Sequence, residues 1–186
     1  MKYDSDIHHR RSLRWQGYDY ASPGYYFVTV CTQEKECLFG SIVNNDMQLN
    51  DAGRMIQTVW HQLPDRFAFI TTDEFIVMPN HIHGILAFRS QPANNEPPID
   101  RDKHPDGERP EGTLPETIGR IMQAFKSICT HDYITGVKQQ GWQRFSGRLW
   151  QRNFWERVIR NELELMHIRE YIHYNPAGWQ TDKLYR

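Results

Sequence analysis

The sequence of 186 residues predicts an α+β domain built on an antiparallel sheet. Runs rich in aromatic and β-branched residues alternate with stretches of helical periodicity, in the order β-β-α-β-β-α-α. The apolar fraction of 39% and the aromatic fraction of 13% are typical of a chain that folds around a core. We therefore expect one domain over residues 1–186, since this length suits a single core.

The first half of the chain contains the expected strands and one helix. Its strand segments are rich in aromatic and β-branched residues. The helix is capped by Asn50 or Asp51 and ends before Pro64. The expected strands are 24–33 (GYYFVTVCTQ), 74–78 and 81–88, and 41–50 contains a hairpin turn at Asn44-Asn45.

The second half contains two expected helices after an irregular segment. Residues 89–113 are rich in proline, glycine and charge, which predicts a flexible loop or insertion. Thr113 is expected to open a long helix that stops near Gly136. The apolar stripe of that helix contains Ile118, Ile121, Met122, Phe125 and Ile128. The last helix covers about 161–175, ends at Pro176 and buries Leu165, Ile168 and Ile172.

The charges are distributed unevenly along the chain. Residues 1–113 have 11 Lys/Arg against 16 Asp/Glu, whereas residues 114–186 have 11 against 7. Residues 138–160 hold six basic side chains and one acid, interleaved with aromatic residues. Such a segment suits single-stranded nucleic acid, because guanidinium groups pair with phosphates and rings stack on unpaired bases. At least two of its aromatic residues are instead expected to belong to the core. The candidate DNA-binding residues are Arg144, Arg148, Trp150, Arg152 and Trp155, with Arg10, Arg11 and Arg14 of a basic N-terminal arm (1–23) as a second group.

The sequence also predicts a cellular location. No apolar run is as long as a membrane span, and the polar N-terminus does not have the pattern of a signal peptide. Three cysteines are an odd number and form no C-x-x-C pair. We expect reduced thiols, a cytoplasmic protein and no membrane partner.

The segment MPNHIHGIL (78–86) contains two histidines one residue apart in a predicted strand. Side chains at i and i+2 point to the same face, so His81 and His83 lie side by side. Two imidazoles on one face can chelate a divalent metal ion. The alternative is a pair of solvated histidines on the polar face of an amphipathic strand. If a metal binds, its third ligand comes from elsewhere in the chain.

The last helix carries a second group of polar residues. Tyr171 and Asn175 are four residues apart and so lie on one face, and His167 lies one turn earlier on the same row. With the two histidines they offer nitrogen and oxygen ligands and a phenolic nucleophile for metal-assisted phosphoryl transfer. In the alternative interpretation Tyr171 packs in the core and Asn175 precedes proline as a helix stop.

Four motifs, in this order, resemble those of REP-associated tyrosine transposases, which belong to the HUH single-strand transposase superfamily. They are MPNHIHGIL, FKSICT, LWQRNFWERVIRNELEL and YIHYNP, and the resemblance extends from about Gly24 to Trp179. The resemblance implies a ferredoxin-like antiparallel sheet of the HUH-endonuclease type with helices packed on it. It places the metal ligands at His81, His83 and Asn175 and the nucleophile at Tyr171, with Glu156 as a candidate accessory residue. His167 is a second accessory candidate, as a further ligand or proton acceptor, because of its position on the row of Tyr171. Relatives that move insertion sequences have Gln at the position of Asn175, and many members have Glu-His where this chain has Glu156-Arg157.

The resemblance also implies an activity. The implied activity is that of a transposase, which cuts and transfers strands of single-stranded, hairpin-forming repeat DNA. The implied enzyme uses Mg²⁺ or Mn²⁺ and forms a 5′-phosphotyrosine intermediate. The protein is then expected to be a monomer or homodimer. One alternative is a domesticated protein that binds DNA hairpins without transposing. A zinc hydrolase for small phosphoesters is a further alternative, but the sequence has no acidic ligand at the expected spacing from the histidines.

Overall fold

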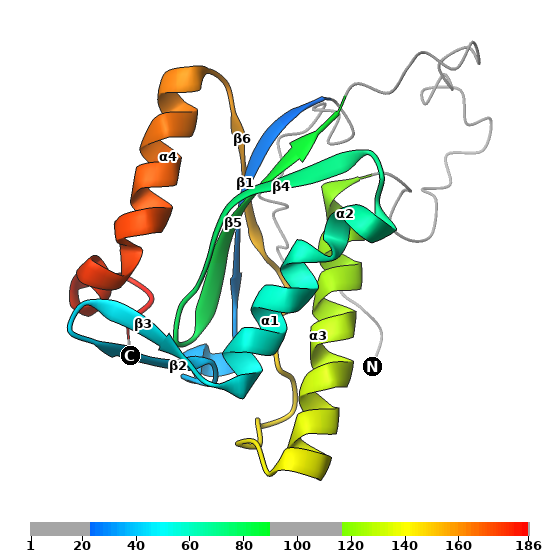
Figure 1. The fold of residues 1–186 in the computed structure, drawn as a ribbon, viewed down its shortest axis with the longest axis vertical. Coiled ribbons are helices and arrows are strands. Elements are labelled where there is room, and N and C mark those ends of the chain that lie inside the picture. Colours follow the sequence, from blue (N-terminus) through cyan, green and yellow to red (C-terminus); the bar gives the residue numbers. More distant parts are fainter. Residues whose placement is uncertain (1–22, 90–116, 186) are drawn as a thin grey trace, which may run out of the picture.

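A computed structural model describes residues 23–89 and 117–185. Four strands form one antiparallel sheet in the order β4-β5-β1-β6 (Figure 1). A separate hairpin pairs β2 with β3. The strands are β1 (Gly24–Cys31), β2 (Gly40–Val43), β3 (Asp46–Leu49), β4 (Ile70–Val77), β5 (His81–Phe88) and β6 (Trp155–Ile159). The prediction of an α+β fold with an antiparallel sheet is confirmed.

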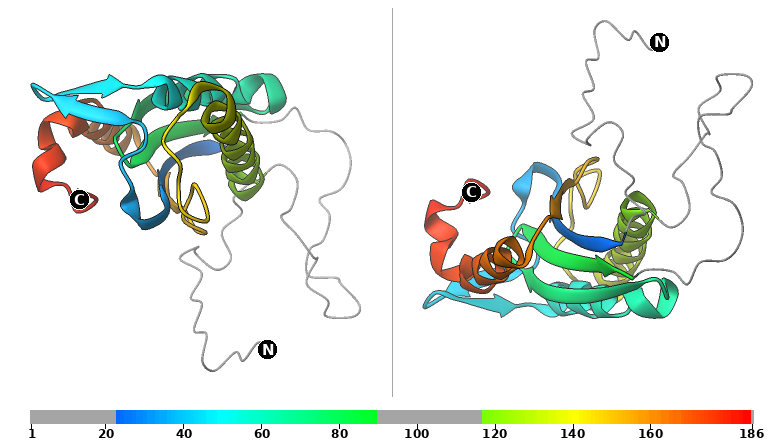
Figure 2. Two further views of the ribbon diagram at one scale, coloured as in Figure 1. Left: turned by 90° about the horizontal axis from the view of Figure 1, so that it is seen from below. Right: turned by 90° about the horizontal axis from the view of Figure 1, so that it is seen from above.

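The helices cover both faces of this sheet. Helices α1 (Asp51–His61) and α3 (Ile118–Gln140) lie together on one face, and α4 (Glu162–Tyr174) lies on the other (Figures 1 and 2). The short α2 (Leu63–Arg66) follows α1, and two 3-10 turns, η1 (Gln33–Lys35) and η2 (Asn175–Thr181), complete the elements. Without the β2–β3 hairpin and α4, the order is β-α-β-β-α-β with the strand arrangement of a ferredoxin-like fold.

Several local predictions are confirmed by backbone geometry. Asn44 and Asn45 both have positive φ (52° and 65°), which a two-residue turn between antiparallel strands requires. The Asn50 side chain accepts a hydrogen bond of 2.9 Å from the Gly53 N–H and caps α1. Asn161 caps α4 in the same way, 2.8 Å from the Glu164 N–H, and Asn175 ends that helix before Pro176.

Three predicted boundaries or elements differ from the structure. The long helix is capped by Thr117, not opened by Thr113, and it continues past Gly136 to a left-handed Gly141 (φ 69°). β4 begins at Ile70, four residues earlier than expected, because a bulge between Thr72 and Phe75 lets the strand continue through polar residues. β6 was not predicted, since its charged sequence acquires a strand conformation only by pairing with β1.

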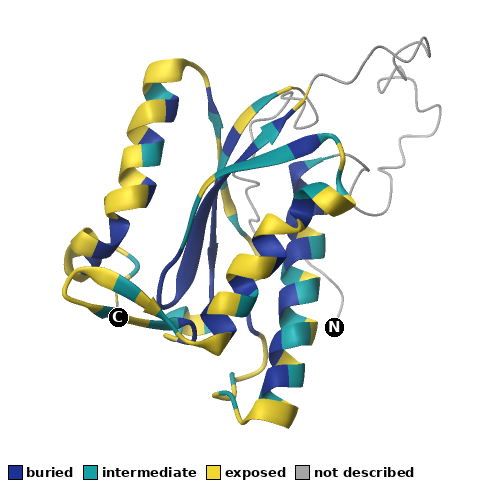
Figure 3. Cartoon of the chain, in the orientation of Figure 1, coloured by how far each residue is buried: buried dark blue, intermediate teal, exposed yellow. Residues whose placement is uncertain are grey.

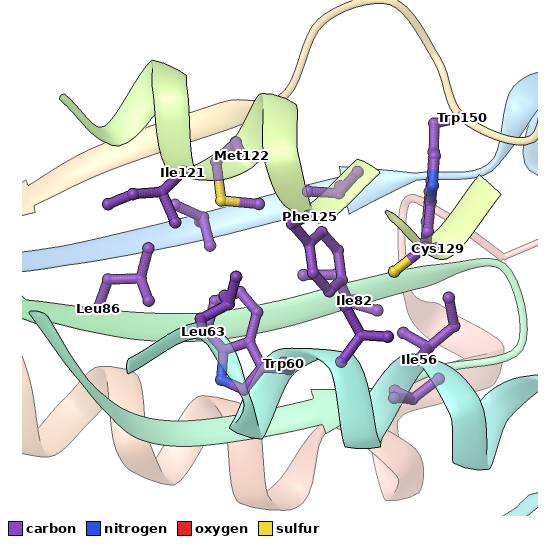
Figure 4. Close-up of a cluster of buried hydrophobic side chains, with 14 of the residues drawn as sticks. Ile56, Trp60, Leu63, Ile82, Leu86, Ile121, Met122, Phe125, Cys129 and Trp150 are labelled. Carbon is purple, nitrogen blue, oxygen red and sulfur yellow. The ribbon is translucent and has the colours of Figure 1, made fainter. Parts of the chain in front are cut away.

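The main core lies between the sheet and the α1/α3 layer (Figures 3 and 4). Trp60 of α1 stacks on Phe75 at 4.6 Å and meets Phe125 of α3 edge-on at 5.6 Å. Gly84 of β5 lies directly under this indole, and a Cβ there would lie 2.4 Å from the Trp60 ring. The close contact between Gly84 and Trp60 therefore fixes the strand that carries the histidines, and only glycine permits this contact.

A smaller apolar cluster holds α4 on the opposite face of the sheet. The predicted stripe of Leu165, Ile168 and Ile172 is buried there against Ile85 and Ile159. Arg169 also forms a bidentate salt bridge with Asp73 of β4. Its Nε and one terminal nitrogen lie 2.8 and 2.7 Å from the two carboxylate oxygens. These contacts fix α4 across β5, which carries the histidine pair, and its neighbours in the sheet.

Parts of the predicted organisation lie outside the described residues. The N-terminal arm with Arg10, Arg11 and Arg14 and the segment 89–113 fall there, except for residues 23 and 89. Within the two described ranges, none of the helices is long and apolar enough to cross a membrane.

Candidate active site

The histidine pair lies at the start of β5, on the face of the sheet that α4 covers. His81 and His83 are buried, with relative exposures of 0% and 3%, and their Nε2 atoms are 3.1 Å apart. Alternation along β5 sends Ile82 into the main core on the other face. The prediction that the two imidazoles share one face is confirmed, and the alternative of solvated histidines is wrong because both rings are buried.

Asn80 fixes the protonation of His81. The Asn80 Nδ2 donates hydrogen bonds to the carbonyl oxygens of Lys35 (3.2 Å) and Leu184 (2.8 Å). Its Oδ1 therefore faces His81, and the Nδ1–H of His81 donates to it at 2.8 Å. With the proton on Nδ1, the Nε2 of His81 presents a lone pair toward His83.

His83 is oriented by the neighbouring strand and by α4. Its Nδ1 lies 2.8 Å from the hydroxyl of Thr29, the residue paired with it on β1. Its Nε2 lies 3.2 Å from the hydroxyl of Tyr171. Phe27 stacks on the imidazole with ring centres 5.3 Å apart, which limits its rotation.

Tyr171 and Asn175 complete this side of the site. Tyr171 is 47% exposed, so the interpretation in which it packs in the core is wrong. Asn175 is 5% exposed, and its Oδ1 has no hydrogen-bond partner among the described residues. A buried carbonyl-type oxygen without a partner is costly, and a cation would satisfy it.

The structure adds a residue that the sequence did not indicate. A ligand atom of Asp182 lies within 4.8 Å of those of His81 and His83. Asp182 follows η2 and is separated from the histidines by almost the whole second half of the chain. No spacing rule links it to them, and only its position after the Asn-Pro helix end hints that the chain turns back toward the site.

Burial controls the ionisation of these groups. Burial lowers the pKa of both His81 and His83 to about 3, with a smaller contribution to His81 from the charge of Lys35. Burial also raises the pKa of Tyr171, Asp182 raises it further, and a hydrogen bond from Asn175 opposes both effects. The imidazoles are thus neutral near neutral pH, as metal ligands must be, and the phenol remains protonated.

The residues present fit a divalent metal ion. Metal–imidazole bonds of about 2.1 Å reach two nitrogens 3.1 Å apart from one point. The Nε2 lone pair of His81, the unpartnered Oδ1 of Asn175 and the carboxylate of Asp182 supply nitrogen and oxygen donors. Hard oxygen ligands combined with imidazole are compatible with Mg²⁺ or Mn²⁺.

Two pockets flank Tyr171. One, of about 630 Å³, is lined by His83, Tyr171, Asn175, Asp182 and Trp155 among others. The other, of about 670 Å³, is lined by Arg157, Arg160, Asn161, Glu164 and His167 beside apolar side chains, and Glu164 is paired with Arg157. Because Tyr171 and Phe27 line both pockets, the phenol lies between two open spaces on the surface.

The two accessory residues occupy different places. His167 is exposed and lines the pocket beside Tyr171, but it is outside the cluster of ligand atoms formed by His81, His83 and Asp182. Glu156 pairs with Val28, whose side chain lies in the main core. Glu156 is therefore directed to the α1/α3 face by strand alternation, and the structure does not bring it to the site.

The candidate DNA-binding residues also divide. Trp150 is 4% exposed and packs against Phe39 and Phe125, so it is a core residue and cannot stack on a base. Trp155 is 59% exposed and shares a row across the sheet with Thr29 and His83. The remaining described candidates, Arg144, Arg148 and Arg152, are exposed.

The chain is similar in sequence to two known proteins. No family model matches the chain. An uncharacterized protein of Haemophilus influenzae is 40% identical over 189 residues, covering 99% of this chain and 97% of that protein. A second protein of the same organism, named "Putative REP-associated tyrosine transposase", is 24% identical over 159 residues, covering 86% and 73%.

A solved structure gives the fold a known counterpart. A REP-associated tyrosine transposase bound to a REP hairpin superposes with a TM-score of 0.56 at 19% identity, covering 90% of this chain and 74% of that one. The predicted resemblance is thereby confirmed, as is the fold class. The chain belongs to the same family as the H. influenzae protein of 40% identity, and it has the fold of the REP-associated tyrosine transposases, which it resembles in sequence.

Proposed function

We propose that this protein is a tyrosine transposase that cuts and rejoins single-stranded, hairpin-forming DNA. The observation that supports this most directly is the contact of 3.2 Å between the Tyr171 hydroxyl and His83 Nε2. It joins a nucleophile on α4 to a histidine pair on β5 that fits a metal ion. The relationship to transposases supports a transposase-type activity in general, and the residue roles below are our proposal.

In this proposal His81, His83 and Asn175 would hold Mg²⁺ or Mn²⁺, which would supply polarisation of the scissile phosphate. The Tyr171 oxygen attacks the phosphorus atom while the bond from phosphorus to the 3′ oxygen breaks. The leaving 3′ oxygen takes up a proton, so the products are a 5′-phosphotyrosine and a strand with a free 3′-OH. Attack by that hydroxyl, or by one of another strand, reverses the step and joins DNA without an external energy source.

The phenol must lose its proton before it attacks. Its raised pKa makes this unfavourable in the protein alone, and the Asn175 hydrogen bond opposes the effect only in part. A nearby cation favours the phenolate. His167, which lines the same pocket as Tyr171, is placed to receive the proton through water.

The proposed DNA path runs through the two pockets beside Tyr171 and along the basic segment. The pocket with Arg157 and Arg160 suits phosphates, and Trp155 beside the other pocket suits stacking on an unpaired base. The solved relative is bound to a REP hairpin, and we propose a hairpin substrate here also. We further propose a single domain that acts in the cytoplasm as a monomer or homodimer. The three cysteines, which all lie in the described ranges, form no disulfide.

The alternative is a protein that binds DNA hairpins without cutting them. Such a protein does not need buried, oriented histidines or an exposed phenol beside them. Both features are present here, which favours the enzyme.

The test is incubation of the full chain with labelled single-stranded hairpin DNA and Mg²⁺, followed by a denaturing gel. We expect a covalent protein–DNA adduct and a shorter free strand. Tyr171→Phe should abolish both while binding the hairpin as well as the wild type. Its stability should change by about 1 kcal/mol or less, because only one hydroxyl is removed.

The matched control is Tyr25→Phe, which removes the hydroxyl of a tyrosine on β1 that is 37% exposed and lines neither of the two pockets. It should leave adduct formation unchanged. An adduct that persists in Tyr171→Phe would contradict the mechanism, and hairpin binding without any adduct in the wild type would favour the binding-only alternative.

A further inference from the structure

The segment after α4 returns to the histidine pair and is tied there by several contacts. The Asn80 amide donates to the carbonyl oxygen of Leu184 at 2.8 Å, and the Lys35 Nζ donates to that of Lys183, also at 2.8 Å. The ring of Trp179 lies 5.9 Å from that of His81. These contacts hold residues 179–184 beside the ligand atoms of β5.

Asp182 is held rigidly within this segment. One of its oxygens, Oδ1, accepts a hydrogen bond of 2.7 Å from the Leu184 N–H, and its own backbone N–H donates to the Trp179 carbonyl at 3.1 Å. A carboxylate has two oxygens, so this bond still leaves acceptor capacity toward the site. Its ligand atom lies within 4.8 Å of those of both histidines, and the residue lines the pocket shared by His83, Tyr171 and Asn175.

We propose that Asp182 is a ligand of the metal ion, supplying the one negative charge in a set otherwise made of two imidazoles and an amide. This inference rests on the proposed function, which places a divalent ion at the histidine pair, and it adds a ligand on a different element. An anionic oxygen strengthens the attraction for a doubly charged cation and shifts the preference toward Mg²⁺ or Mn²⁺.

Asn80 connects this ligand to the histidines. Its Oδ1 fixes the ring of His81, and its Nδ2 holds the backbone beside Asp182. A single amide therefore orients one ligand directly and positions another through Leu184. Asn80 acts as a positioning residue, since its own polar atoms are already used in these bonds.

The test measures Mn²⁺ binding to the full-length protein without DNA, by the loss of the free-ion signal in electron paramagnetic resonance. Asp182→Asn removes the charge but keeps an oxygen that can accept the Leu184 N–H, so the segment should stay folded. We expect its Mn²⁺ dissociation constant to rise roughly tenfold or more, as even residues that only support a ligand have effects of this size. Asp182→Ala, which removes both oxygens, should show at least as large an effect.

The matched control is Asp65→Asn, which neutralises an exposed carboxylate on α2, outside the site. It should bind Mn²⁺ like the wild type, and His83→Gln should lose most of the binding. Wild-type affinity in both Asp182 variants, with His83→Gln defective, would overturn the proposal and leave the histidine site intact. No Mn²⁺ binding in the wild type would overturn both. Mn²⁺ binding that depends on Asp182 without any DNA adduct would refute the proposed reaction alone.

Discussion

The side chain of Tyr171 is partly exposed, but its hydroxyl group lies beside buried polar groups. Nearly half of the residue is accessible, yet its hydroxyl faces a buried imidazole and a buried amide. Exposure allows a phosphate to approach the oxygen, whereas the partial burial of the side chain raises the pKa of the phenol. The chemistry of this residue is therefore expected to be sensitive to pH.

We predict that the rate of adduct formation rises with pH across the neutral range. The phenolate attacks, and the pKa of Tyr171 is raised above its usual value of about 10. Well below the pKa, the phenolate fraction increases about tenfold per pH unit. The rate should therefore rise by the same factor until the pH reaches the pKa that the Tyr171 phenol has in the presence of the metal ion. Single-turnover rates at fixed Mg²⁺ measure this, with hairpin affinity at each pH as control. A rate independent of pH would show that deprotonation does not limit the reaction.

The element that determines the site is α4, because it carries both Tyr171 and Asn175. It is attached to the sheet by a small apolar cluster and by the contact between Arg169 and Asp73. The cluster fixes the distance of the helix from the sheet, and the ion pair ties the middle of the helix to edge strand β4. The position of Tyr171 therefore depends on few contacts.

We predict that Arg169→Ala destabilises the protein by about 1 kcal/mol, a value reduced for the partial exposure of Arg169. The Arg169 hydrogen bond lowers the pKa of Asp73 in the folded state. The resulting stabilisation is present above the unfolded pKa of about 3.9 and is lost as pH falls through the folded value. Urea unfolding at pH 7 and pH 3 measures both effects, and the difference between wild type and variant should shrink at pH 3.

The control for this pair is Arg54→Ala, which removes an exposed arginine paired with Asp51 within α1. We expect a change of about 0.5 kcal/mol or less. Equal effects of the two substitutions would mean that the Arg169 contact does not anchor α4.

Strand β5 depends on the glycine between the histidine pair and the apolar residues that follow. We predict that Gly84→Ala destabilises the protein by about 1–3 kcal/mol, because the added methyl group meets the rigid Trp60 ring. Gly178→Ala is the control, since a Cβ there has nothing within 4 Å. Thermal unfolding of both variants gives the comparison. Equal stability would show that Trp60 can move without cost.

At the scale of the whole molecule, the main core and the candidate site lie on opposite faces of the sheet. The α1/α3 face holds the main core, including Trp150, and the α4 face holds the site and its two pockets. The segment before β6 connects them, and it carries the exposed Arg144, Arg148 and Arg152. Lys126 of α3 holds this segment through hydrogen bonds to the carbonyl oxygens of Gln151 and Arg152.

We predict that Arg148→Ala and Arg152→Ala each weaken binding to single strands of any sequence and reduce its salt dependence. Each lost phosphate contact should lower the slope of log K against log salt by about 0.7. Fluorescence anisotropy at several salt concentrations measures the slope. Arg66→Ala, on α2 and outside this segment, should leave it unchanged. Slopes equal to that of the wild type in both variants would mean that these arginines do not contact DNA.

The sequence alone determined the elements that depend on local chemistry. Strand alternation put His81 and His83 on one face, helical spacing put Leu165, Ile168 and Ile172 in one stripe, and the Asn-Asn turn gave the hairpin. These patterns have periods of two to four residues, so they are visible in any short window of sequence.

Only the tertiary structure decided what depends on contacts between distant segments. Trp150 and Trp155 have the same side chain in one basic-aromatic segment, and pairing with different neighbours buries the first and exposes the second. β6 exists because β1 offers it a partner, and Glu156 faces the core side because Val28 fixes the register. Asp182 reaches the histidines through the return of the chain after α4, which Asn80 and Lys35 secure. Such contacts depend on the path of the whole chain, and no local pattern encodes them.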